Sequence, residues 1–285
     1  GATTLGTSVM LDTTTGLSAG RGILFAGTGT IAGTTANAQA LTINAGTVGT
    51  IQVNGAIGST TTLSSLTVTH SGGARFIGAV SVDTSIVLTN TVSGAVVSFE
   101  GGLSTPVLTT TSNPYGISLT GSNNSITTSI EFLNTGSLAL GNSSTDAFSF
   151  GGNLTVTAPS SLLIAGVFTA GGSITLGDAG TGISLSSGTS ISTAAVNADI
   201  NINGAVTGAS NTFTVRAGTG TINFGGAVSG LGATTLIANE INVSANYAGT
   251  NTLVIAPATT SRGIYLGVSS NSDTTVLNLT SAELG

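Results

Sequence analysis

The sequence predicts an all-β protein whose short strands wind as a parallel β-solenoid of roughly 11–14 coils. Residues 41–57, 66–80 and 213–228 repeat one pattern: an alternating apolar and polar run, a glycine-rich corner, and a second alternating run. A unit of about 20–26 residues cannot bury its apolar face alone, so it must stack on its neighbours. Helix start signals followed by a 3.6-residue apolar period are absent.

The composition is that of a strand-forming chain with very little charge. It has 43 glycines and 51 threonines in 285 residues, and charged residues make up 5% against about 25% in an average soluble domain. Hydrophobic residues reach 40%, which is more than disordered segments contain. The net charge is −6 and there is no lysine, so nucleic acid and anionic membranes are poor partners. No cysteine is present, which excludes disulfides and the usual zinc spacings.

The repeat is marked by a glycine that follows an apolar residue and precedes a small residue and then Val, Ile or Leu. We call these positions the anchoring glycines, and they are Gly55, Gly78, Gly101, Gly152, Gly204 and Gly226. The spacing from Gly55 to Gly78 equals that from Gly78 to Gly101, and the last two glycines are separated by nearly the same number of residues. The spacing on each side of Gly152 is close to the length of two repeat units. The residue two places before each glycine is expected to point inward at an equivalent position of each coil: Val53, Phe76, Phe99, Phe150, Ile202 and Phe224.

Short alternating runs such as residues 51–53, 66–68, 200–202 and 222–224 predict strands with one buried and one wet face. A parallel sheet covered by helices would show continuous apolar runs instead. An antiparallel sandwich fits the frequent turn signals but needs a period of about 90–100 residues, which is absent. We expect one solenoid over residues 1–285 that belongs to a longer repeat protein, with an irregular coil or loop at 109–142 around Pro114 and Tyr115.

Two phrases, AGTVGTIQVNGAIG (45–58) and AGTGTINFGGAVSG (217–230), resemble repeats of bacterial surface proteins of the filamentous haemagglutinin and autotransporter type. Residues 262–267 and 273–284 add to the likeness. The resemblance implies a right-handed parallel β-helix, export from the cell, and a role in adhesion or the cell-surface matrix.

Candidate catalytic residues are sparse. The only histidine, His70, precedes Ser71-Gly72-Gly73 and is expected in a solvated turn. Carboxylates for acid–base chemistry are scattered almost one per coil: Asp12, Asp83, Glu100, Glu131, Asp146, Asp178, Asp199, Glu240, Asp273 and Glu283. Stacking is able to bring Asp83 near Glu100, or Asp178 near Asp199. No tandem calcium repeat or dinucleotide fingerprint is present, so we predict no catalytic, cofactor or metal site and no enzyme activity.

The sequence therefore favours a structural segment of an extracellular adhesin, fibre or sheath, without cofactors. The alternative is a protein on the same scaffold that binds or cleaves polysaccharide. Expected partners are further copies of the chain, or the rest of a longer polypeptide, at both solenoid ends, where open strand edges invite pairing. Glycans of a neighbouring surface are a further expected partner. No nucleic acid and no membrane insertion are expected, because no apolar run reaches the length that a membrane span needs.

Overall fold

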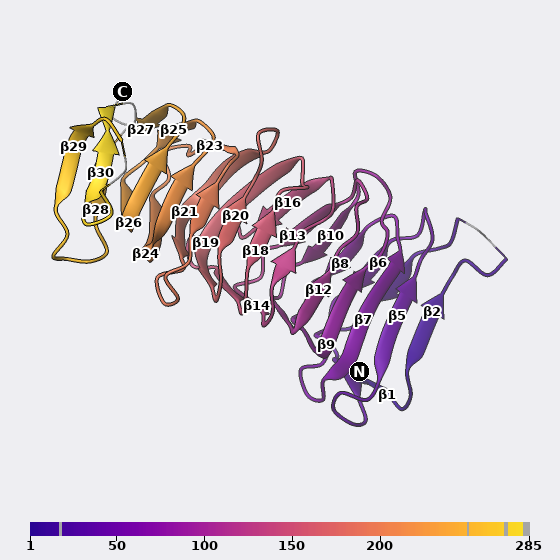
Figure 1. Cartoon of the computed structure of the whole chain (residues 1–285). Helices are drawn as coiled ribbons and strands as arrows, with labels where there is room; N and C mark the ends of the chain where they lie inside the picture. Colours follow the sequence, from indigo (N-terminus) through magenta and orange to yellow (C-terminus); the bar gives the residue numbers. More distant parts are fainter. Residues whose placement is uncertain (17–18, 250, 271–272, 282–285) are drawn as a thin grey trace. The chain divides into compact units, whose positions relative to one another are not determined.

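The computed structural model describes residues 1–16, 19–249, 251–270 and 273–281. Within this part of the chain every assigned element is a β-strand (Figure 1). The chain divides into two compact units, Gly1–Gly141 and Asn142–Gly285. The pairings inside each unit are parallel, and together the units contain about ten turns of a β-solenoid. The predicted fold class is therefore confirmed.

Unit 1 contains sixteen described strands. They are β1 (Thr3–Leu5), β2 (Val9–Asp12), β3 (Ile23–Phe25), β4 (Ile31–Gly33), β5 (Ala40–Asn44), β6 (Ile51–Val53), β7 (Leu63–His70), β8 (Ala74–Phe76), β9 (Val80–Leu88), β10 (Val96–Phe99), β11 (Leu103–Thr105), β12 (Val107–Thr109), β13 (Gly116–Leu119), β14 (Asn123–Ile126), β15 (Ile130–Glu131) and β16 (Ser137–Leu140).

Three ladders of parallel strands form the walls of unit 1. The first, here called the β8 ladder, joins β3, β6, β8, β10, β13 and β16 in that order. The second joins β2, β5, β7, β9 and β12, whose members lie side by side in Figure 1. The third runs through Ile31, Ile57 and the start of β9 to β11 and β14. Each turn therefore contributes a short strand to each of three faces.

Unit 2 repeats this three-walled plan. Its strands are β17 (Ala147–Phe150), β18 (Leu154–Val156), β19 (Ser161–Ala170), β20 (Ile174–Leu176), β21 (Gly182–Ser192), β22 (Ile200–Ile202), β23 (Ala205–Thr207), β24 (Phe213–Phe224), β25 (Val228–Leu231), β26 (Thr234–Val243), β27 (Tyr247–Gly249), β28 (Leu253–Ala256), β29 (Ile264–Val268) and β30 (Leu277–Thr280). One wall, here called the β22 ladder, joins β18, β20, β22, β24 and β26. Strands β29 and β30 pair with each other.

The number of turns is slightly below the 11–14 expected because turn length varies more than the sequence pattern indicates. In unit 1, Val9 pairs with Leu41, so the chain makes a long excursion before it returns to the same wall. In unit 2, Ile222 pairs with Ile241 after a much shorter path. The long first turns therefore use residues that a uniform repeat would assign to further coils.

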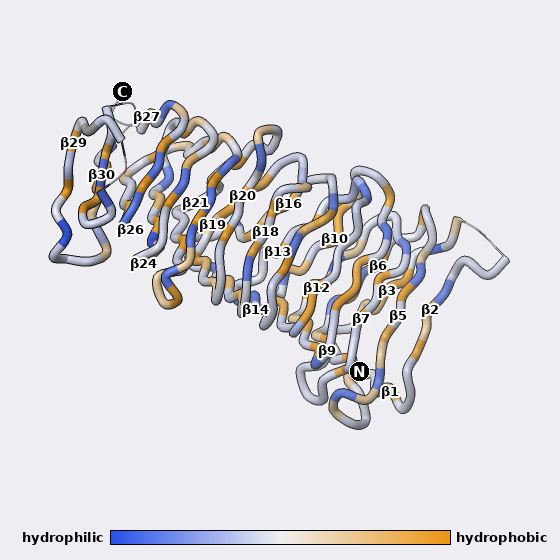
Figure 2. The backbone as a smooth tube through the Cα atoms, in the orientation of Figure 1, coloured by the Kyte–Doolittle hydropathy of each residue, from blue (hydrophilic) through white to orange (hydrophobic). Residues whose placement is uncertain are grey.

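The interior is built from the alternate apolar residues of the strands. Figure 2 shows hydrophobic and hydrophilic residues interspersed along the strands of both units. All six residues expected to point inward are buried, with exposed fractions of 3% or less. Val53, Phe76 and Phe99 face one another in successive strands of the β8 ladder, and Ile202 faces Phe224 in the β22 ladder. These contacts confirm the inward positions.

The prediction that all six residues occupy equivalent positions is wrong. The first three lie in the β8 ladder, Ile202 and Phe224 lie in the β22 ladder, and Phe150 lies in neither. Phe150 lies in β17 opposite Ala170, whereas Ile202 lies in the β22 ladder opposite Leu176. The sequence FGGNL thus marks a different corner of the turn from INGAV, although both place an aromatic or aliphatic residue inward. The long interval between the glycines of these two motifs is therefore not two whole turns.

Within each unit, anchoring glycines of successive turns stack backbone to backbone, as Gly55, Gly78 and Gly101 do in unit 1. A Cβ atom added to Gly78 would lie 2.5 Å from the carbonyl carbon of Gly55, and one added to Gly101 would lie 2.4 Å from that of Gly78. Gly226 lies in the same way over Gly204, at 2.4 Å. A side chain has no room at these corners, which explains why the motif carries glycine.

The interval 109–142, for which an irregular coil or loop is predicted, contains β13 to β16. Strand β13 pairs in regular register with β10 on one side and with β16 on the other. Tyr115 is fully buried at the corner before β13. Its hydroxyl donates to the carbonyl of Leu88 at 3.1 Å and accepts from the backbone N–H of Thr111 at 3.2 Å. Pro114 and Tyr115 thus form an ordered corner between regular strands.

Candidate binding surface

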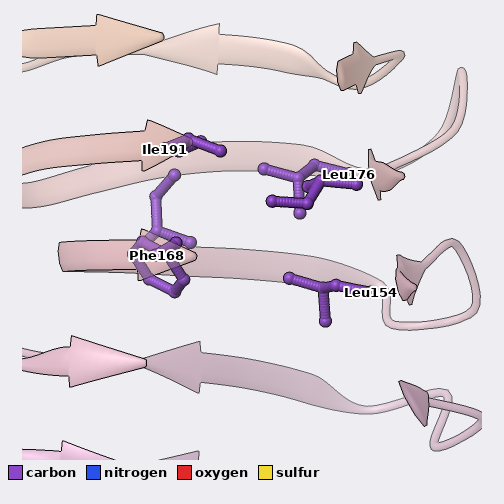
Figure 3. Close-up of a pocket in the computed structure, with 6 residues that line it drawn as sticks. Leu154, Phe168, Leu176 and Ile191 are labelled. Atoms are coloured by element: carbon purple, nitrogen blue, oxygen red, sulfur yellow. The ribbon is translucent and has the colours of Figure 1, made fainter. Parts of the chain in front are cut away.

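The interior of unit 2 is closed to ligands around Phe168. Leu154, Phe168, Leu176 and Ile191 extend from successive strands into the space that the turns enclose (Figure 3). Together with Ile164 and Ile174 they leave approximately 0 Å³ accessible to a water molecule. A ligand of this part of the fold must therefore bind on the outside of the walls.

The carboxylates singled out in the sequence have separate hydrogen-bond partners. Asp83 accepts from the hydroxyl of Thr62 at 2.5 Å, whereas Glu100 accepts from Arg75. Asp178 accepts from the backbone N–H of Gly180 at 2.8 Å, and Asp199 accepts from that of Thr221 at 2.8 Å. No hydrogen bond joins the members of either pair among the described residues. Glu283 lies outside the described residues.

His70 does not lie in a turn as expected. It is the last residue of β7, is half-buried, and pairs with Asn44 of β5. The carbonyl of His70 accepts a hydrogen bond from the N–H of Ala45 at 2.9 Å. Within the described residues, no group of three His, Cys, Asp or Glu side chains is arranged to hold a metal ion.

The outward face of the β8 ladder carries a row of polar side chains. The parallel register pairs Arg75 of β8 with Gln52 of β6 on one side and with Ser98 of β10 on the other. Their neighbours in sequence are the buried residues that fill the interior. Period-two alternation thus places these three side chains on the outer surface.

Arg75 is fixed by an ion pair with Glu100 of the next turn. Its Nε donates to one carboxylate oxygen at 2.6 Å and an Nη donates to the other at 2.9 Å. The two side chains are 51% and 32% exposed. Hydrogen bonding to Glu100, and then the charge of Glu100, raise the pKa of Arg75. This bidentate geometry orients the guanidinium along the surface.

A shallow hollow of about 350 Å³ lies beside this pair. Gly73 contributes no side chain between Thr50 and Val96, so the wall is recessed there. The hollow is lined by Thr50, Ile51, Gln52, Gly73, Ala74, Arg75, Val96 and Ser98. We call it the Arg75 hollow.

Unit 2 presents two neutral polar surfaces. Ser144, Thr189, Ser190, Thr212 and Thr214 line a second shallow hollow of about 180 Å³. Three asparagines, Asn201, Asn223 and Asn242, also stack on the outside of the β22 ladder. The amide of Asn223 donates to Asn201 at 2.8 Å, and the amide of Asn242 donates to Asn223 at 2.8 Å. This asparagine ladder stabilises the wall along the direction of stacking.

Sequence reasoning missed the pairing of Arg75 with Glu100. Arg75 lies opposite Ser98 of the next turn, and Glu100 is the second residue after Ser98, on the same outward side of the chain. The separation of Arg75 and Glu100 can be read from the sequence. It predicts a contact only when the number of residues in that turn is known. The recess at Gly73 carries no signal of its own, because glycine is frequent throughout the chain.

Comparison of the chain with protein-family models, with curated proteins and with solved structures found no match. No helix in the described residues is long and apolar enough to span a membrane. The parallel stacked strands alone define the class, which is that of a parallel β-solenoid repeat protein.

Proposed function

We propose that the chain is a non-enzymatic structural segment of an extracellular bacterial adhesin, fibre or sheath, which mediates surface attachment or matrix assembly. The observation that carries this proposal is the closed, stacked interior, in which residues such as Phe76 and Phe99 form columns from turn to turn. Such a scaffold adds length and surface with each repeat. Its outer faces offer hydroxyls, amides and few charges.

The separated carboxylates favour a structural role over polysaccharide cleavage. Asp83 and Glu100 each accept hydrogen bonds from a different neighbour, and so do Asp178 and Asp199. Glycoside hydrolysis generally needs two carboxylates that face one bond. The extracellular and bacterial parts of the proposal rest on the resemblance of residues 45–58 and 217–230 to surface-protein repeats.

Immunogold labelling of intact cells that naturally produce the protein tests the location. Antibodies raised against the purified chain should label the outer surface or extracellular threads without permeabilisation. Labelling that appears only after permeabilisation would overturn the proposal.

A second assay separates the structural role from the enzymatic alternative. The purified chain is incubated with pectin-, alginate- and glucan-type polymers, and chain length is followed by size-exclusion chromatography. We expect unchanged polymer length. Shortening that is lost in a Glu100→Gln or Asp178→Asn variant would instead support the enzyme.

A further inference from the structure

We infer that the Arg75 hollow binds one unit of a neutral glycan, with Arg75 and Gln52, which both line it, as the residues that recognise its hydroxyl groups. This inference rests on the proposed function, since it assigns a ligand class and a position to the surface attachment proposed above. It is carried by the recess at Gly73, the fixed ion pair at its edge, and the mixture of donors and acceptors around it.

The hollow has the volume of a subsite for a small ligand. Its volume of about 350 Å³ is at the lower end of the range for small-molecule sites, about 300–1,000 Å³. The recess exists because Gly73, which has no side chain, lies between Thr50 of the preceding turn and Val96 of the following turn. Gly73 has a φ of 133°, a region that favours glycine, so the backbone itself keeps this position free of a side chain.

The polar groups of the hollow match hydroxyl groups, which both donate and accept. Arg75 uses two of its N–H groups on Glu100, and a guanidinium has five, so three remain to donate. The side-chain amide nitrogen of Gln52 donates to Asn54 at 2.8 Å. This bond fixes the orientation of the amide group, and the carbonyl oxygen of Gln52 remains able to accept a hydrogen bond from a ligand. Vicinal hydroxyls of a sugar fit such an alternation of donors and acceptors, and the methyl groups of Val96, which is 40% exposed, offer contact for ring C–H groups.

The electrostatics favour a neutral saccharide over an acidic one. Arg75 is the only charged residue that lines the hollow, and its charge is compensated by Glu100 at 2.6 Å. The chain also carries a net charge of −6, which repels polyanions at long range. A sulfated or uronic acid polymer would therefore meet no uncompensated cation here.

The test is chemical-shift mapping on the ¹⁵N-labelled full chain, titrated with short linear oligosaccharides of glucose, mannose or galactose and, in parallel, of galacturonic acid. We expect at least one neutral oligosaccharide to shift the amides of residues 50–52, 73–75 and 96–98 in a saturable manner. The site is open, so weak affinity is expected and shift mapping is the suitable measurement.

Matched variants assign the binding to the hollow. Ser98→Tyr fills the hollow and Arg75→Gln removes the donors, and each should weaken binding by about tenfold or more. Ser118→Tyr is the control for the first, because Ser118 lies one turn further along the same outward row but outside the hollow. Arg216→Gln, an exposed arginine in β24 of unit 2, is the control for the second. Circular dichroism confirms that each variant is folded.

Four results would overturn the inference: no shifts with any neutral oligosaccharide, shifts confined to other surfaces, tighter binding of the galacturonic acid oligomer, or equal losses in the two control variants. The immunogold experiment is independent of all four. A surface-exposed protein that binds no neutral saccharide would retain the proposed function and lose only this ligand assignment.

Discussion

Phe148 and Phe168 lie face to face in neighbouring turns of unit 2, with ring centroids 4.6 Å apart and an interplanar angle of 5°. They occupy matching positions in β17 and β19, so the stack is a direct consequence of the parallel register. Both rings are almost completely buried. The same relationship holds in unit 1 for Phe76 and Phe99, at 4.9 Å and 11°. Columns of like side chains therefore hold each unit together along the direction of stacking.

Truncating one ring of this column should be costly. Phe168→Ala leaves a cavity in a tightly packed interior and should lower the free energy of unfolding by about 3–5 kcal/mol. Val167→Ala is the control, because the neighbouring Val167 side chain is 43% exposed and its truncation should change stability by about 0.5 kcal/mol or less. Urea denaturation followed by circular dichroism measures both. Equal losses in the two variants would contradict the assigned inward and outward faces.

The stacked glycines should not tolerate even one methyl group. Gly78→Ala places a Cβ 2.5 Å from backbone atoms of Gly55 and Ala56, so the turns must separate locally, and we expect a loss of about 1–3 kcal/mol. Gly182→Ala is the matched change, since a Cβ there meets nothing within 4 Å. That variant should keep or slightly raise stability. Thermal unfolding of the two variants compares them directly, and a neutral Gly78→Ala would show that the turns are not in backbone contact.

Each asparagine of the ladder should contribute to the free energy of unfolding in proportion to the number of ladder hydrogen bonds that it makes. Asn223→Ala removes both amide hydrogen bonds of the ladder and should cost about 1–2 kcal/mol, and Asn201→Ala, which removes one of them, should cost about half as much. Thr175→Ala lies in the same outward row and serves as the control for loss of a polar side chain. Chemical denaturation measures all three. The ladder would have no stabilising role if the three variants were equally stable.

The pKa of Asp178 should be below its ordinary value of 3.8. The hydroxyl of Thr181, first, and the N–H of Gly180 donate to its carboxylate and lower the pKa. A carboxylate whose pKa is depressed on folding stabilises the protein above the unfolded value, and this contribution is lost as the pH falls through the folded pKa. Thermal stability should therefore decline below pH 3.8, and Asp178→Asn should show a weaker decline.

Thr181→Val isolates the cause of this shift, because it removes the hydroxyl donor and keeps the shape of the side chain. The variant should raise the pKa of Asp178 toward 3.8. Titration of the Asp178 carboxyl carbon by NMR measures the pKa in both proteins. An unchanged value in Thr181→Val would show that the hydroxyl does not set it.

The sequence by itself determined the class of fold and the side of each strand that is buried. Alternation is a property of one short segment, so Val53, Phe76, Phe99, Ile202 and Phe224 were all placed inward without knowledge of their neighbours. The glycines at the corners were also predictable, because the motif that contains them recurs in several turns.

Only the tertiary structure decided which residues of different turns meet. The path along the chain between paired residues differs widely from turn to turn, since the corners between strands differ in length, and a single change in length shifts every later pairing. Phe150 was therefore assigned to the wrong column, and the pairing of Arg75 with Glu100 and the recess at Gly73 were not predicted. Burial is specified locally by side-chain alternation, whereas surface sites depend on register between turns, which the corners set.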